Sequence, residues 1–266
     1  MNTDELRVCI LRVAGTNRDG DVKNVFEHLG IKADVCHLNR IAREKNLLDY
    51  HIAVLPGGFS YGDYIRSGAI FGKELKIKIG DQMKKFVDDG RALLGICNGF
   101  QILVESGFVP AINGASEYPE AVLANNASAR FECRWISMKN QDSACKLTEN
   151  MSKGKTIRAP IAHGEGRFIV DSKVMEKLKE NKQIVFRYVK PSGESANGEY
   201  PFNPNGSTGD IAGICNPEGN VFALMPHPED SFFRFQYPDW TSNTNGEFGD
   251  GKVLFESIIE YAKKRF

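Results

Sequence analysis

The stretch ALLGICNGFQ, residues 92–101, decides the fold of this chain, because a strand changes into a helix within it. Ala92 to Ile96 is a continuous apolar run typical of a buried strand, and Phe100 to Val104 continues with helical spacing. Gly95 and Gly99 on either side of Cys97 allow the sharp turn between the two. A strand that leads at once into a helix is half of a β-α-β unit, in which helices connect parallel strands.

Strands and helices also alternate on the amino-terminal side of this stretch. Apolar runs at 6–13, 33–38 and 52–55 predict strands, and the spacing at 22–29 and 73–89 predicts helices. This order indicates an α/β fold of three layers, with a mostly parallel central sheet and helices on both faces. Ligands bind beyond the carboxyl ends of such strands, where the glycine-rich turns at 57–58 and 95–99 lie.

The second half of the chain is richer in strands. Extended segments are predicted at 131–138, 184–189, 211–215 and 221–225, and residues 216–220 form a turn between the last two. These segments add antiparallel strands to the sheet. Residues 191–209 are predicted to form a long loop and residues 252–264 a closing helix. Because no linker divides the sequence, we expect one domain over residues 1–266.

Composition excludes several classes of function. The 266 residues contain 34 Lys plus Arg and 34 Asp plus Glu, a balance that gives no reason to expect nucleic-acid binding or an anionic membrane surface. The first residues lack an apolar signal core, and no apolar run is long enough to span a bilayer, so we expect a cytoplasmic protein. None of the six cysteines has the spacing of a zinc site.

Cys97 is the candidate nucleophile. Gly95-Ile96-Cys97-Asn98-Gly99 has the form of a nucleophile elbow with cysteine in place of serine. The turn places the thiol at a helix N-terminus, where unpaired amides and the helix dipole favour the thiolate. A buried structural cysteine beside a tight turn explains this short pattern equally well.

The segment Pro226-His227-Pro228-Glu229 supplies a candidate base. Pro228 keeps the segment out of a helix, and residues two apart in an extended segment point the same way. The Glu229 carboxylate can then bond one imidazole nitrogen of His227 and leave the other for a nucleophile. Taken alone, a His-Pro pair is more typical of a simple turn.

The same chemistry requires backbone amides that stabilise the negative charge on the attacked carbonyl oxygen. Asn98, the residue after the nucleophile, supplies one such amide. The turn Pro56-Gly57-Gly58 follows a neighbouring strand, and Gly58 is the candidate for the second amide. An ordinary turn is the alternative for any Gly-Gly pair.

In this order, Pro-Gly-Gly, Gly-x-Cys-x-Gly-x-Gln and His-Pro-Glu resemble the class I, triad-type glutamine amidotransferases. The resemblance implies their flavodoxin-like fold and hydrolysis of glutamine through a cysteine thioester. It also implies the role of each residue. Cys97, His227 and Glu229 would form the triad, and Gly58 and Asn98 the oxyanion hole. Gln101 and Gly57 would contact glutamine.

Longer segments resemble the branch of the family that serves phosphoribosylformylglycinamidine synthase. These are residues 11–17, 59–66, 95–101, 129–132, 160–166 and 200–207, so that the likeness extends over nearly the whole chain. It implies the glutaminase subunit of an enzyme of purine biosynthesis. The ammonia would go to a synthetase subunit (PurL), joined through a small bridging subunit (PurS), which converts formylglycinamide ribonucleotide to its amidine.

The resemblance places ATP and magnesium on the synthetase, and no cofactor or metal is expected in this chain. In agreement, the chain has no phosphate-binding loop, because Glu149 stands where the first glycine before Gly154-Lys155-Thr156 belongs. His163 and Glu165 are expected to shape the glutamine pocket or the path to the partner.

Two positions depart from the family pattern, Arg18 after Thr-Asn and Asp230 after His-Pro-Glu. Neither is expected to touch the triad, and both are expected to alter the partner-facing surface. Three other functions remain as alternatives: a cysteine peptidase on the same scaffold, a glutaminase that serves another synthetase, and a non-catalytic regulatory relative. Gln101 and the long matching segments argue against a peptidase, and an intact Cys, His and Glu argues against a non-catalytic relative.

Overall fold

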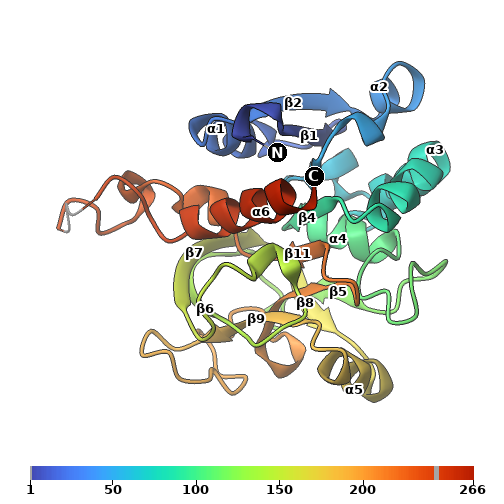
Figure 1. Ribbon diagram of the computed structural model, residues 1–266. Helices are drawn as coiled ribbons and strands as arrows, with labels where there is room; N and C mark the ends of the chain where they lie inside the picture. The colour runs from blue at the N-terminus through green and yellow to red at the C-terminus, as the bar shows by residue number, and fades with distance from the viewer. Residues whose placement is uncertain (1, 243–245) are drawn as a thin grey trace.

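The computed structural model describes residues 2–242 and 246–266. Its centre is a nine-stranded sheet with the strand order β2-β1-β3-β4-β11-β10-β9-β6-β7. Helices lie on both faces of this sheet, and the N-terminal strands form one end of it in Figure 1, with the strands of the second half at the other end. The predicted fold class is confirmed.

Five neighbouring strands form the parallel half of the sheet. Strand β4 pairs in parallel with β3 on one side and β11 on the other, and β1 lies between β2 and β3. The residues of the three central strands are all buried, as expected for parallel strands covered on both faces. The bounds are Arg7–Arg12 (β1), Lys32–His37 (β2), Ile52–Leu55 (β3), Ala92–Ile96 (β4) and Val221–Leu224 (β11).

The other four strands of the sheet are antiparallel and continue from β11. Strand β10 forms a hairpin with β11 through the predicted turn at 216–220, and β9, β6 and β7 follow in order. A separate ribbon pairs β5 with β8. The bounds are Val122–Asn125 (β5), Glu132–Asn140 (β6), Thr156–His163 (β7), Glu165–Ile169 (β8), Ile184–Val189 (β9) and Ile211–Cys215 (β10).

Two groups of helices complete the layers. Helices α1 and α6 contact each other through the rings of Phe26 and Phe255, whose centroids lie 5.5 Å apart, and α3 packs against α4. The six helices of the described chain are Asp19–His28 (α1), Leu38–Arg43 (α2), Ala69–Asp88 (α3), Asn98–Glu105 (α4), Ser172–Glu180 (α5) and Lys252–Arg265 (α6). None of the described helices is long and apolar enough to cross a membrane.

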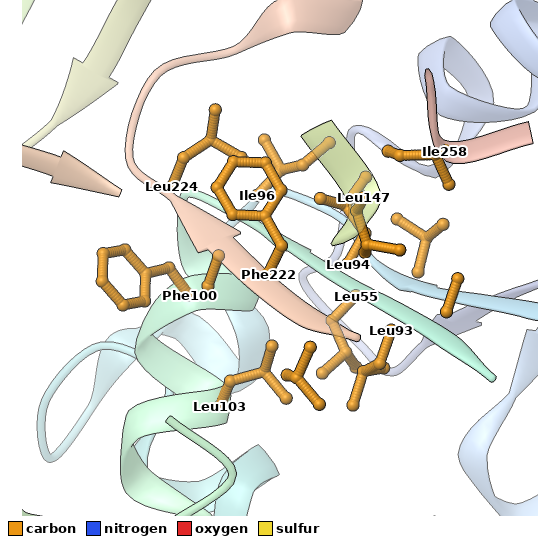
Figure 2. Packing of buried hydrophobic residues seen from close by; sticks show 14 of the residues in the cluster. Leu55, Leu93, Leu94, Ile96, Phe100, Leu103, Leu147, Phe222, Leu224 and Ile258 are labelled. Carbon is orange, nitrogen blue, oxygen red and sulfur yellow. The ribbon is translucent and has the colours of Figure 1, made fainter. Parts of the chain in front are cut away.

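The core fills both sides of β4 and β11. Leu94 and Phe222 are partners in adjacent strands and share one face of the sheet, while Leu93 points to the opposite face. Figure 2 shows Ile258 of α6 on the side of Leu94 and Leu103 of α4 on the other side. Because these side chains are buried on both faces, β4 and β11 are held in place, and so are the starts of the loops that follow them.

Most predicted elements are confirmed, but several were missed. Helix α3 begins four residues before the predicted start at Lys73, and α2, α5, β5, β7 and β8 were not predicted. Pro160 hid β7, because proline cannot donate to a ladder and argues against a central strand. Since β7 lies at the edge of the sheet, it tolerates the proline.

Candidate active site

Cys97 lies between β4 and α4 with its backbone at φ 52° and ψ −105°. This conformation is rare for a residue with a side chain. Both neighbouring glycines are needed: a Cβ at Gly99 would lie 1.8 Å from the carbonyl oxygen of Leu55, and one at Gly95 would lie 2.7 Å from that of Gly99. The segment is therefore a nucleophile elbow in its geometry as well as in its sequence.

His227 and Glu229 are both buried in the loop that follows β11. The imidazole Nδ1 lies 2.7 Å from Oε1 of Glu229, and the backbone amide of His227 donates to the carbonyl of Pro160 in β7 at 2.9 Å. The predicted pairing of these two side chains is confirmed, and it leaves Nε2 for another partner. The predicted extended segment is wrong, because Pro228–Ser231 form a 3-10 helix whose first position suits the proline.

The surroundings of His227 raise the pKa of its imidazole, so that it accepts a proton more readily. Burial lowers the pKa of His227, but the charges of Glu229 and Cys97 and the hydrogen bond with Glu229 outweigh burial and raise it well above the usual value. Nε2 of His227 is buried and has no hydrogen-bond partner among the described residues, and the Cys97 thiol in the same cleft donates to the carbonyl of Ala162 at 3.9 Å. The three side chains thus have the order that a triad requires: Glu229 holds Nδ1 of His227, and Nε2 is left for the nucleophile.

The sheet itself sets the separation of Cys97 and His227. Their strands, β4 and β11, are parallel neighbours, with Ile96 opposite Leu224, and the Cys97 amide donates to the carbonyl of Leu224 at 2.8 Å. Both residues open into a cleft of about 410 Å³ at the carboxyl ends of these strands. The cleft is lined by Asn17, Arg18, Gly58, Phe59, Cys97, Phe131, Ala162 and His227.

The two predicted oxyanion donors lie beside the nucleophile. Asn98 is the first residue of α4, so its amide has no acceptor within the helix. Gly58 lines the cleft at φ 145°, and its amide has no backbone acceptor within the described ranges. Gly57 contributes in another way, because a Cβ there would lie 2.7 Å from Cε1 of His227. Its missing side chain makes room for the imidazole.

Gln101 is buried, and both the oxygen and the nitrogen of its side-chain amide form hydrogen bonds within the protein. Its Oε1 accepts from Nδ2 of Asn98 at 2.9 Å, and its Nε2 donates to the carbonyl of Glu165. The Glu165 carboxylate in turn accepts from the amide of Ser67 at 3.0 Å. Gln101 and Glu165 therefore connect the elbow to the loop after β3, and direct contact of either with glutamine stays a prediction.

His163 lies at the end of β7 with its ring buried and outside the lining of the cleft. Burial, followed by the charge of His227, lowers the pKa of His163 to about 3, so the ring is neutral. Its Nδ1 lies 3.0 Å from Oδ1 of Asn126, which also accepts from the amide of Gly166, so Nδ1 is the protonated nitrogen. A neutral imidazole already held in this way supports the view that His163 shapes the site.

Arg18 and Asp230 form an ion pair beside the triad. Nη2 of Arg18 lies 3.3 Å from Oδ2 of Asp230, and Arg18 lines the cleft beside Cys97. The expectation that neither residue touches the triad is wrong for Asp230, whose amide donates to the carbonyl of His227 at 3.2 Å and whose carboxylate lies within 4.8 Å of ligand atoms of His227 and Glu229. This group has metal-ligand chemistry, but Glu229 already holds His227, and Arg18 holds Asp230. That both Arg18 and Asp230 alter the partner-facing surface stays a prediction.

Comparison with known proteins agrees with this geometry. Residues 5–262 match the family described as the CobB/CobQ-like glutamine amidotransferase domain. The chain is 41% identical to the phosphoribosylformylglycinamidine synthase subunit PurQ of Archaeoglobus fulgidus, over 99% of this chain and 100% of that protein. It is 46% identical to the subunit of the same name from Treponema denticola, over 85% of this chain and 88% of that protein.

Solved structures show the same fold. A chain in the structure of PurLQS from Thermotoga maritima superposes with a TM-score of 0.73 and 35% identity, over 97% of this chain and 99% of that chain. The glutaminase domain of Trypanosoma brucei CTPS shares the fold at a TM-score of 0.55 and 14% identity, over 97% of this chain and 94% of that one. The chain therefore belongs to the family of CobB/CobQ-like glutamine amidotransferase domains, among the PurQ subunits of phosphoribosylformylglycinamidine synthase.

Proposed function

We propose that this chain is the glutaminase subunit of phosphoribosylformylglycinamidine synthase in the purine pathway of the cytoplasm. One domain, residues 1–266, would release ammonia from glutamine and pass it to a synthetase subunit (PurL), assembled with a small bridging subunit (PurS). The synthetase would use the ammonia to convert formylglycinamide ribonucleotide to its amidine. The observation that carries the proposal is the nucleophile elbow at Cys97 in one cleft with the hydrogen-bonded pair of His227 and Glu229, at the ends of two neighbouring strands.

The first half of the reaction forms a thioester. Cys97 gives its proton to His227, and the thiolate attacks the side-chain amide carbon of glutamine. The amides of Gly58 and Asn98 donate to the oxygen as it gains negative charge. His227 then protonates the departing nitrogen, and ammonia leaves. A raised pKa suits His227 to this step, because the imidazolium that forms is stabilised by Glu229.

The second half returns the enzyme to its starting state. His227, again neutral, takes a proton from water, and the water oxygen attacks the thioester carbonyl. The same two amides stabilise the oxyanion, and glutamate leaves as Cys97 regains its proton. We assign Gly57, Gln101, His163 and Glu165 to the walls that hold glutamine. None of these steps uses a cofactor or a metal from this chain, and ATP and magnesium would act on the synthetase.

The test measures amidine formation from glutamine and from ammonium salts separately. In a complex of the three subunits, Cys97→Ala is expected to reduce amidine formation from glutamine by roughly a thousandfold or more, because the nucleophile is lost. Formation from ammonium salts should stay at the wild-type rate. The variant should still bind glutamine, measured by calorimetry, since the walls of the site are unchanged.

The opposite result is equally clear. If Cys97→Ala removed ammonium-dependent synthesis in a complex shown to assemble, the chain would contribute to the synthetase site itself. If the wild-type chain hydrolysed glutamine but supported a different synthetase only, the assignment to purine biosynthesis would fall while the glutaminase assignment would stand.

A further inference from the structure

The loop that follows β1 packs its backbone directly against the glycine turn that follows β3. The amide of Phe59 donates to the carbonyl of Gly15 at 3.0 Å, and the amide of Asn17 donates to the carbonyl of Gly57 at 3.5 Å. Both hydrogen bonds join backbone groups of the two loops. The loops are therefore tied together on either side of Gly58.

These bonds fix the direction of the peptide between Gly57 and Gly58. The Gly57 carbonyl also accepts from the amide of Arg18 at 3.2 Å, so it is turned toward the loop after β1. In a trans peptide such as this one, the N–H points away from the preceding carbonyl. Thr16 lies opposite Gly58 as the non-hydrogen-bonded pair of an antiparallel bridge, in which the amides point outward. The Gly58 N–H therefore points away from the loop after β1, and Gly58 lines the cleft with Cys97.

The two loops are in contact so close that neither can move alone. A Cβ at Gly58 would lie 2.8 Å from the amide nitrogen of Asn17 and 3.0 Å from Cα of Thr16. A Cβ at Gly15 would lie 2.1 Å from the carbonyl oxygen of Phe59. Because packed backbones transmit displacements, a change in the loop after β1 would turn the Gly58 amide.

The side chain of Thr16 holds the shape of the loop after β1. Thr16 is buried, its hydroxyl accepts from the amide of Val13 at 3.3 Å, and its own amide donates to the carbonyl of Val13 at 3.3 Å. Val13 directly follows β1, so the two bonds fasten the loop to the end of a strand. A threonine hydroxyl that bonds to nearby backbone in this way stabilises a turn. This hydroxyl is the one side-chain group among the bonds described here, so a substitution can remove it.

We propose that Thr16 is a positioning residue for glutamine hydrolysis, which holds the loop after β1 and, through it, the Gly58 N–H in the direction of the oxyanion. The inference rests on the proposed function, because the oxyanion forms on the glutamine amide that Cys97 attacks. Oxyanion donors are effective because they are oriented before the charge develops. A peptide turned the other way would present the carbonyl oxygen of Gly57 and repel that charge. Thr16 itself does not line the cleft, so it acts only through Gly58.

The experiment removes the hydroxyl and keeps the shape of the side chain. Thr16→Val is compared with Thr16→Ser, which retains the hydroxyl. Thr148→Val is the matched control, because Thr148 is also buried and its hydroxyl donates to the carbonyl of Cys145, three residues away, at 3.3 Å, outside the lining of the cleft. Thr16→Ala lacks the hydroxyl and adds no bulk, so a folding defect in Thr16→Val does not decide the result.

Glutamate release, measured in the complex of the three subunits, should separate these variants. We expect Thr16→Val and Thr16→Ala to lower kcat by roughly tenfold or more, since complete loss of one oxyanion donor costs roughly a hundredfold. KM for glutamine should stay within about threefold, because the lost interaction belongs to the transition state. Thr16→Ser and Thr148→Val should keep kcat close to that of the wild type.

A second measurement shows whether the nucleophile is affected. Alkylation of Cys97 by iodoacetamide requires the thiolate but places no oxyanion between Gly58 and Asn98. We therefore expect the alkylation rate of Thr16→Val to match that of the wild type while kcat falls. A parallel fall in both rates would show that Thr16 acts on the nucleophile and would overturn the inference.

Three further results are decisive. An unchanged kcat in folded Thr16→Val would show that the loop keeps its shape without the hydroxyl, and equal losses in Thr16→Val and Thr16→Ser would assign the effect to packing of the methyl group. Either result overturns the inference. If the wild type released glutamate but its complex formed no amidine, the proposed function would fall, while a kcat loss confined to Thr16→Val and Thr16→Ala would still support the role of Thr16.

Discussion

Asp230 carries a charge that the folded protein holds at a cost. Burial, and then the charge of Glu229, raise the pKa of the Asp230 carboxyl to about 6, although Arg18 and His227 act in the opposite direction. A carboxyl that binds its proton more tightly in the folded state than in the unfolded state opposes folding once it is ionised. The ion pair with Arg18 reduces this penalty without removing it.

Asp230→Asn is therefore expected to stabilise the protein at neutral pH. Below about pH 4 the carboxyl is protonated in both states, and the substitution should have little effect. Between about pH 4 and 6 the folded state binds more protons, so wild-type stability falls as the pH rises, and above about pH 6 the difference stays constant. Urea unfolding at pH 7.5 should show a gain on the order of 1–2 kcal/mol that shrinks toward pH 4.

Asp21→Asn is the control, because Asp21 is the other carboxylate bonded to Arg18, at 3.3 Å, and is more exposed. This substitution should change the free energy of unfolding by less than about 1 kcal/mol at either pH. A loss of stability in Asp230→Asn at pH 7.5 would mean that the Arg18 ion pair outweighs the burial of the charge.

At the scale of elements, the contact between β3 and α4 depends on the absence of one side chain. Gly99 in the first turn of α4 lies directly against the end of β3, so a Cβ there would lie 1.8 Å from the carbonyl oxygen of Leu55. That oxygen belongs to the backbone of a buried strand and has no room to move away. The close approach brings the helix N-terminus over the sheet edge where Cys97 lies.

Gly99→Ala is expected to destabilise the protein by roughly 3 kcal/mol or more, because the added methyl group must displace a strand or the helix. Chemical denaturation followed by circular dichroism measures the change. Gly20→Ala in α1 is the matched control, since nothing lies within 4 Å of its added Cβ and alanine favours helix. Equal stabilities for the two variants would show that β3 and α4 can separate without loss.

The elements that the sequence predicted best are those with continuous local signals. Strands β3, β4, β9 and β10 begin and end at the predicted residues, because each is an apolar run bounded by turn residues or a change of polarity. Strand β7 alternates buried positions with Thr156, Arg158 and Pro160, and its proline concealed it. The proline is tolerated because β7 lies at the edge of the sheet. Which strand lies at the edge is decided by the pairing of all the strands, so a local sequence pattern does not show it.

In the candidate site, too, contacts between residues close in sequence could be predicted, and contacts between distant residues could not. His227 and Glu229 are two residues apart, so their contact could be predicted from the local sequence, although the segment is a 3-10 helix from Pro228 and not extended. Arg18 and Asp230 lie 212 positions apart, and no spacing rule relates them. Only the folding of the loop after β1 against the loop after β11 brings their charges together.

At the scale of the whole molecule, the site lies where the two halves of the sheet meet. Strand β11 is parallel to β4 and antiparallel to β10, so it belongs to both halves. The loop after β11 brings His227 beside Cys97 and also bonds to the carbonyl of Pro160 in β7, at the far edge. The triad residues follow two strands of the parallel half, and the antiparallel half contributes the carbonyl of Pro160 that holds the backbone of His227.

The backbone amide of Cys97 donates a hydrogen bond to the carbonyl of Leu224 at 2.8 Å. The distance between Cys97 and His227 is therefore set by the hydrogen-bond ladder of the sheet. Heating should therefore leave glutaminase activity intact until the sheet melts, and the loss of activity and of the far-ultraviolet circular dichroism signal should coincide within a few degrees, as for a cooperative two-state transition. Inactivation well below the melting of the sheet would show that the loops fail first. If the two curves coincide, glutamine turnover reports how much of the chain is folded, and a simple ammonia assay can serve to follow its refolding.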